Sequence, residues 1–86
     1  MTSQKDKIRI LYVDDEKRNT SSFKGAFRRD FQIDTATWAI DGKALLEKKE
    51  YHILLTDQRM PGITGVEFLS EICELYPDVM RILLTA

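Results

Sequence analysis

Two stretches of the sequence indicate the fold most clearly: IRILYVDDE at residues 8–16 and HILLTDQRMPGITGVEFL at residues 52–69. Each contains a short run of β-branched and other apolar residues that stops abruptly at acidic residues, namely Asp14 and Asp15 in the first stretch and Asp57 in the second. Short continuous apolar runs are typical of strands that are buried on both faces. We therefore expect two buried strands that present carboxylates at their C-terminal ends.

The segments around these two strands alternate between helix and strand patterns. Helix-forming residues at helical spacing, alternating apolar residues and turn signals predict the element order βαβαβαβ. The expected strands are residues 8–13, 31–36, 52–56 and 79–84, and the expected helices are residues 17–29, residues 41–50 and a third that follows Thr64. The strand at 31–36 has one polar face, so we expect it near the edge of the sheet.

The third helix has the clearest start signal. Thr64 and Glu67 form a capping box, and Ile63 is placed to pack on Phe68. The apolar face of this helix is expected to continue through Val66, Leu69, Ile72, Cys73 and Tyr76. On this interpretation Cys73 is a core thiol.

Polar side chains follow three of the four expected strands. Strands joined by helical crossovers are parallel, and their carboxyl ends meet at one edge of the sheet. Asp14 and Asp15, Asp57, and Thr85 should therefore lie close together. Mg²⁺ prefers such oxygen ligands, an aspartate can act as a nucleophile toward phosphorus, and a hydroxyl can hydrogen-bond a phosphoryl oxygen. The residues alone predict a Mg²⁺-assisted phosphoryl site.

Composition excludes several classes of protein. The 86 residues carry 13 Lys and Arg against 14 Asp and Glu, a net charge of −1, which argues against nucleic acid as an electrostatic partner. A single cysteine excludes an internal disulfide framework and favours a cytoplasmic location. The apolar runs are too short to span a membrane. We expect one domain over residues 1–86, with a polar leader at residues 1–7.

The chain resembles the receiver domain of two-component response regulators. The resemblance rests on VDDE (residues 13–16), TDQRMPGITGVEFL (residues 56–69) and ILLTA (residues 82–86), in that order and with the expected separations. The most specific part is the pattern Asp-x-x-Met-Pro-Gly-x-x-Gly that starts at Asp57. The resemblance implies an α/β fold of the flavodoxin-like class, with an open parallel sheet.

The resemblance also implies roles for individual residues. Asp57 would be the phosphoacceptor, which takes a phosphoryl group from a phosphohistidine of a histidine kinase or phosphotransfer protein. Asp15 would bind Mg²⁺ directly and Asp14 through water, together with Asp57 and the backbone carbonyl of Arg59. Thr85 would be the switch hydroxyl. We also hypothesise that the Arg59 side chain pairs with the acids when the metal is absent.

The chain departs from the family pattern at its C-terminal end. A complete receiver continues with a fourth helix, a fifth strand that ends in an essential lysine, and a fifth helix. No lysine of this chain follows an apolar strand in that way, so we expect a truncated receiver in which competence for phosphorylation is in question. An uncovered apolar face and an open edge at the fourth strand lead us to expect homodimers or larger self-associated species.

Two other functions compete with a phosphoacceptor module that catalyses only its own phosphorylation and dephosphorylation. One is an interaction fragment in which the acids remain but the chemistry does not. The other is a Mg²⁺-dependent phosphohydrolase of the haloacid-dehalogenase kind. Such enzymes carry a second aspartate two residues after the nucleophile of the first strand, where this chain has Glu16. The phosphohydrolase interpretation is therefore the weakest of the three.

Overall fold

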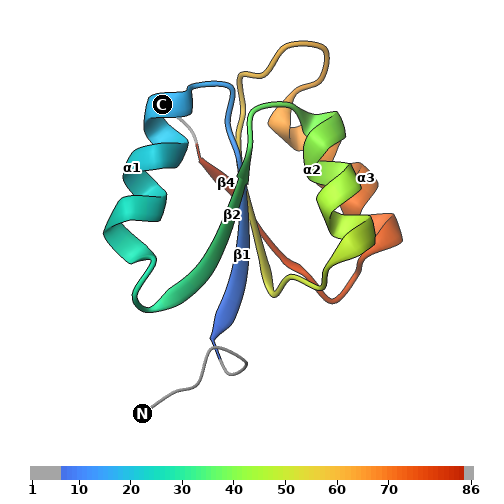
Figure 1. The fold of residues 1–86 in the computed structure, drawn as a ribbon. Coiled ribbons are helices and arrows are strands. Elements are labelled where there is room, and N and C mark those ends of the chain that lie inside the picture. Colours follow the sequence, from blue (N-terminus) through green and yellow to red (C-terminus); the bar gives the residue numbers. More distant parts are fainter. Residues whose placement is uncertain (1–6, 85–86) are drawn as a thin grey trace.

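The computed structural model describes residues 7–84 as one four-stranded parallel sheet, in the order β2-β1-β3-β4, with three helices. The elements are β1 (Ile8–Val13), α1 (Lys17–Phe27), β2 (Phe31–Ala36), α2 (Ala39–Lys48), β3 (Ile53–Asp57), α3 (Gly65–Leu75) and β4 (Met80–Leu84). Helix α1 covers one face of the sheet, and α2 and α3 cover the other (Figure 1). No helix within residues 7–84 has the length and apolar character needed to cross a membrane. The expected flavodoxin-like α/β fold is confirmed.

The register of the central strands aligns their carboxyl ends. Val13, the last residue of β1, lies opposite Ala36 of β2 and opposite Thr56 of β3. Asp57 in turn lies opposite Leu84 at the end of β4. The residues that follow β1 and those at the end of β3 are therefore delivered to the same edge of the sheet.

The core has two parts, one on each face of the sheet. Successive strand residues point to opposite faces, so β1 contributes to both parts. The larger part lies under α2 and α3 and includes the fully buried Leu11, Val13, Leu54, Phe68 and Ile72. The smaller part lies under α1 and consists of Ile10, Tyr12, Ile33 and Leu55, with Phe23, Phe31 and Ile53 packed against them. Residues 7–84 thus bury the α2–α3 face more completely than the α1 face.

The element bounds agree with the expected ranges to within two residues. The bounds of β1 and β2 are as predicted, whereas α2 begins two residues before the expected start at Asp41. Ala39 is buried against the core, and the Gly42 N–H closes the first turn by donating to the Trp38 carbonyl at 3.1 Å. Packing therefore sets the start of α2, and Asp41 lies within its first turn rather than before it.

Helix α3 begins as predicted, and its expected apolar face is confirmed only in part, since Ile72 is buried but Val66 and Cys73 are exposed. The capping box is present: the Glu67 N–H donates to Thr64 Oγ1 at 3.2 Å, and the Thr64 N–H donates to Glu67 Oε1 at 3.1 Å. Phe68 is fully buried, whereas Val66 is 51% exposed, because two residues rotate a helix by roughly 200°. Cys73 is also exposed, so the prediction of a core thiol was wrong.

The two faces of α3 predict opposite outcomes for two truncations. Ile72→Ala should lower the free energy of unfolding by about 2–5 kcal/mol, because Ile72 is fully buried and its loss leaves a cavity. Val66→Ala should change it by no more than about 0.5 kcal/mol, because Val66 is exposed. Urea unfolding followed by circular dichroism measures both. Equal losses in the two variants would contradict the orientation of α3.

Candidate functional site

Three carboxylates gather at the carboxyl edge of the sheet. Asp14, Asp15 and Asp57 each offer an oxygen atom, and these atoms all lie within 4.8 Å of one another. Asp14 is buried, Asp57 is half-buried and Asp15 is exposed, so the cluster opens to solvent on one side. A donor set made only of carboxylate oxygens fits a hard divalent cation such as Mg²⁺ and does not suit softer metals.

The Asp14 carboxylate is held by three hydrogen-bond donors. Tyr12 Oη donates to Asp14 Oδ2 at 2.7 Å, and Asn19 Nδ2 donates to the same oxygen at 3.1 Å. The Glu16 N–H donates to Asp14 Oδ1 at 2.9 Å, and the Asp14 N–H donates to the Ala36 carbonyl at 3.0 Å. Asp14 is only 2% exposed, so its carboxylate has lost its contact with water. The three donors to the carboxylate offset this loss.

Sequence reasoning missed both side-chain partners of Asp14. The available signal for Tyr12 was its place among the aliphatic residues of an expected buried strand, because a buried phenol needs a hydrogen-bond partner. Burial, then the hydrogen bond to Asp14 and the negative charges of Asp14 and Asp57, raise the pKa of Tyr12 above its usual range. The phenol therefore stays protonated at neutral pH and remains a donor to the carboxylate.

The phosphoacceptor candidate Asp57 ends β3, and the next residue ties β3 to α3. The Gln58 N–H donates to the Leu84 carbonyl at 3.3 Å, which extends the pairing with β4 past Asp57. The Gly65 N–H donates to the Gln58 carbonyl at 3.0 Å, and the Val66 N–H donates to Gln58 Oε1 at 3.0 Å. Gln58 thus satisfies two amide donors at the start of α3, a role that the sequence pattern did not reveal.

The loop between β3 and α3 contains a Pro-Gly turn. Gly62 has a φ of 83°, in the left-handed region that favours glycine, directly after Pro61. The Thr56 hydroxyl donates to Met60 Sδ at 3.5 Å, and Met60 and Ile63 both pack against the larger part of the core. The loop is therefore anchored at both ends although its tip is exposed.

Gly65 lets α3 approach the backbone of the phosphoacceptor candidate. A Cβ atom at this position would lie 2.5 Å from the Asp57 carbonyl oxygen and 2.6 Å from Leu83 Cδ1. Both distances are shorter than a normal van der Waals contact, so the Asp57 backbone and the Leu83 side chain would both have to move to accommodate a Cβ atom. A residue without a side chain is therefore required where α3 meets the end of β3.

Three predictions about the site have different outcomes. Arg59 is exposed, and none of the three salt bridges within residues 7–84 involves it, so the hypothesis that its side chain pairs with the acids was wrong. The role of its carbonyl as a metal ligand stays a prediction. Thr85, the predicted switch hydroxyl, lies outside the residues that the structure describes.

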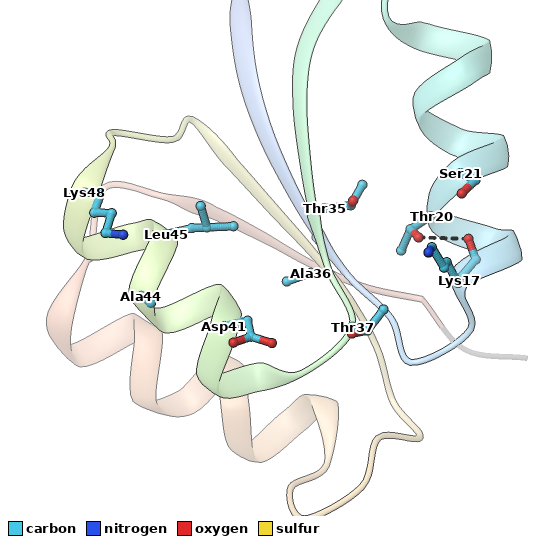
Figure 2. Close-up of a pocket in the computed structure, with 10 residues that line it drawn as sticks. All are labelled: Lys17, Thr20, Ser21, Thr35, Ala36, Thr37, Asp41, Ala44, Leu45 and Lys48. Carbon is cyan, nitrogen blue, oxygen red and sulfur yellow. Dashed lines mark hydrogen bonds between the residues drawn. The ribbon is translucent and has the colours of Figure 1, made fainter.

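A separate groove of about 460 Å³ lies between α1 and α2 beside the end of β2 (Figure 2). The Thr20 hydroxyl, bonded to the Lys17 carbonyl at 3.0 Å, lies on its α1 side, and Asp41 and Lys48 lie on its α2 side. None of the three clustered aspartates lines this groove. The hollow between the helices is therefore not part of the acidic cluster.

The close approach at Gly65 makes a testable prediction about stability. Gly65→Ala should lower the free energy of unfolding by about 1–3 kcal/mol, because the added methyl group overlaps the Asp57 carbonyl. Gly25→Ala is the matched control, since Gly25 lies in α1 and an added Cβ there would meet no atom within 4 Å beyond its chain neighbours and the adjacent backbone of its own helix. That change should raise stability by about 0.5–1 kcal/mol. Equal effects of the two changes in urea unfolding would contradict the packing at Gly65.

Comparison with known proteins places the chain in a family. The family model for the response regulator receiver domain matches residues 10–86. The hydrogenase transcriptional regulatory protein HoxA of Cupriavidus necator is 40% identical over 76 residues, and HoxA of Bradyrhizobium diazoefficiens is 41% identical over 76 residues. Each match covers 88% of this chain but only 16% of the HoxA protein. The chain thus spans a small part of the length of these curated relatives.

Solved structures agree with this result. The response regulator TrrA of Thermotoga maritima, in complex with Mg²⁺ and BeF, is 35% identical with a TM-score of 0.85, over 92% of this chain and 70% of TrrA. A CheY-like receiver domain of Methanospirillum hungatei is 28% identical with a TM-score of 0.88, over 93% of this chain and 65% of that one. The sheet order, the acidic cluster and these matches together show that the chain belongs to the response regulator receiver domain family.

Proposed function

We propose that Asp57 accepts a phosphoryl group from a phosphohistidine of a histidine kinase or phosphotransfer protein, with Mg²⁺ held by Asp14, Asp15 and Asp57. The observation that carries this proposal is the convergence of the three carboxylates within 4.8 Å at the carboxyl edge of the sheet. The 35% identity to TrrA, whose structure contains Mg²⁺ and BeF, supports the choice of metal.

The chemistry is a transfer between two nucleophiles. A carboxylate oxygen of Asp57 forms the new O–P bond while the P–N bond to the phosphohistidine breaks, and the imidazole nitrogen keeps the electron pair. Bound Mg²⁺ would offset the repulsion between the anionic carboxylate and the anionic phosphoryl group. Asp57 is the last residue of β3 and is half-buried, so the sheet positions its backbone while the residue remains partly accessible to a donor protein.

The surroundings of the other two acids suggest different roles. Asp15 is exposed and is free to bind the cation directly, whereas Asp14 is buried and held by three donors, which suits contact through a bound water. The carbonyl of Arg59 would complete the protein ligands, and Thr85 would supply the switch hydroxyl. On this proposal the module catalyses only its own phosphorylation and dephosphorylation.

Phosphorylation can be tested with a small-molecule donor. The 86-residue chain incubated with acetyl phosphate and Mg²⁺ should gain the mass of one phosphoryl group in intact-mass spectrometry, because Asp57 is the nucleophile. Asp57→Asn should abolish the adduct, and Asp78→Asn, at an exposed acid in the turn before β4, should not. An intact adduct in Asp57→Asn would contradict the assignment. Turnover of a generic phosphomonoester would instead favour a phosphohydrolase.

We also propose that the chain self-associates as a two-fold dimer through its α1 face. Phe27 is 41% exposed and Ile82 is 37% exposed on this face. They line an apolar groove of about 260 Å³ with Ile10, Phe23, Phe31, Ile53 and Leu55. Within residues 7–84 the outer edge of β4 has no partner strand, and Met80 and Leu84 share the exposed face of Ile82. Antiparallel pairing of two β4 edges would join the two grooves into one buried surface.

The dimer can be tested by light scattering. The mass should rise from that of a monomer to that of a dimer across micromolar concentrations, and Ile82→Lys should shift the transition at least about tenfold upward, because it places a charge in the apolar groove. Ile40→Lys is the matched control, since Ile40 is 75% exposed and does not line that groove. A monomeric mass throughout, or equal effects of the two variants, would contradict the proposal.

A further inference from the structure

We propose that Tyr12 is a positioning residue for the metal site and that its hydroxyl fixes the Asp14 carboxylate in the orientation that takes up Mg²⁺. This inference rests on the proposed function, since it assigns a residue to the proposed Mg²⁺ site. Two features carry the inference: the way Tyr12 is held, and the number of acceptor positions of Asp14 that are already in use.

Tyr12 is held rigidly on the face of the sheet that α1 covers. It is the fifth residue of β1 and only 5% exposed. Its ring makes an edge-on contact with Phe23 of α1, with ring centroids 5.1 Å apart and an interplanar angle of 72°. Phe23 in turn contacts Phe27, with centroids 4.9 Å apart. Strand and helix therefore fix the ring, and with it the hydroxyl that lies 2.7 Å from Asp14 Oδ2.

The three donors leave the Asp14 carboxylate one preferred way to face a cation. An ionised carboxylate has about four acceptor positions, two on each oxygen. Tyr12 and Asn19 both donate to Oδ2, and the Glu16 N–H donates to Oδ1. Oδ2 is therefore fully used, and the free acceptor position is on Oδ1. Any cation, or the water that it carries, must meet Asp14 through Oδ1.

Removal of the Tyr12 hydroxyl should therefore weaken Mg²⁺ binding without removing a ligand. Tyr12→Phe keeps the ring and its contact with Phe23 but frees one position on Oδ2, so the carboxylate can rotate. Mutation of residues that orient metal ligands typically lowers metal affinity by a factor of about 10–100. We therefore expect the dissociation constant for Mg²⁺ to rise about tenfold in Tyr12→Phe. Isothermal titration of the 86-residue chain with MgCl₂ measures this directly.

Tyr51 supplies a matched control. Its hydroxyl donates to Asp34 Oδ2 at 2.5 Å, and its ring belongs to the core cluster on the opposite face of the sheet. Tyr51→Phe thus deletes the same kind of bond away from the acidic cluster. It should change the Mg²⁺ dissociation constant by less than about twofold, because it touches no group that orients a proposed ligand. A general loss of stability from the removal of a buried phenol hydroxyl would appear in this control as well.

The outcomes separate this inference from the proposed function. Wild-type chain that binds no Mg²⁺ would contradict the proposed metal site itself. Wild-type binding that is lost in Asp14→Asn but unchanged in Tyr12→Phe would overturn the role of Tyr12 alone. If Tyr12→Phe does not fold, Asn19→Ala removes the other donor to Oδ2 from an exposed helix position. A comparable rise in the dissociation constant would then support the inference, and an unchanged value would contradict it.

Discussion

The parallel register of β1 against β3 is the constraint on which the site depends. Because Val13 lies opposite Thr56, the residues that follow β1 arrive beside the end of β3, and three carboxylates meet within 4.8 Å. A shift of one residue in this register would also turn every side chain of a central strand to the other face. The fully buried Leu11 would leave the larger part of the core if β1 shifted, and the fully buried Leu54 would leave it if β3 shifted. The packing that stabilises the fold therefore also sets the geometry of the site.

Bringing three like charges together opposes folding, and the structure shows how part of this opposition is offset. The most buried acid, Asp14, has the most donors, whereas Asp15 faces solvent, which screens its charge. Carboxylates that still repel one another favour the binding of a cation between them. The same balance explains the role we assign to Tyr12, which stabilises the charge of Asp14 and restricts its direction.

Much of this arrangement could be predicted from the sequence, because apolar runs, turn residues and the capping box act locally. The strands that carry Asp14 and Asp57 follow from such patterns. The apolar face of α3 followed only in part: Ile72 is buried as expected, but Val66 and Cys73 are as apolar as buried residues and only tertiary packing turns them outward. The partners of Asp14 were also missed, since a contact between Tyr12 and a carboxylate two residues away depends on side-chain direction that no periodicity encodes.

The most direct test of the central claim is a Mg²⁺ titration followed by amide chemical shifts in two-dimensional NMR. We expect the largest shifts on residues 13–16 and 57–59, the segments that carry the three acids and the Arg59 carbonyl. Smaller shifts should reach the start of α3 through Gln58. Shifts centred on the groove between α1 and α2, or no shifts at millimolar Mg²⁺, would contradict the claim that these carboxylates form the metal site.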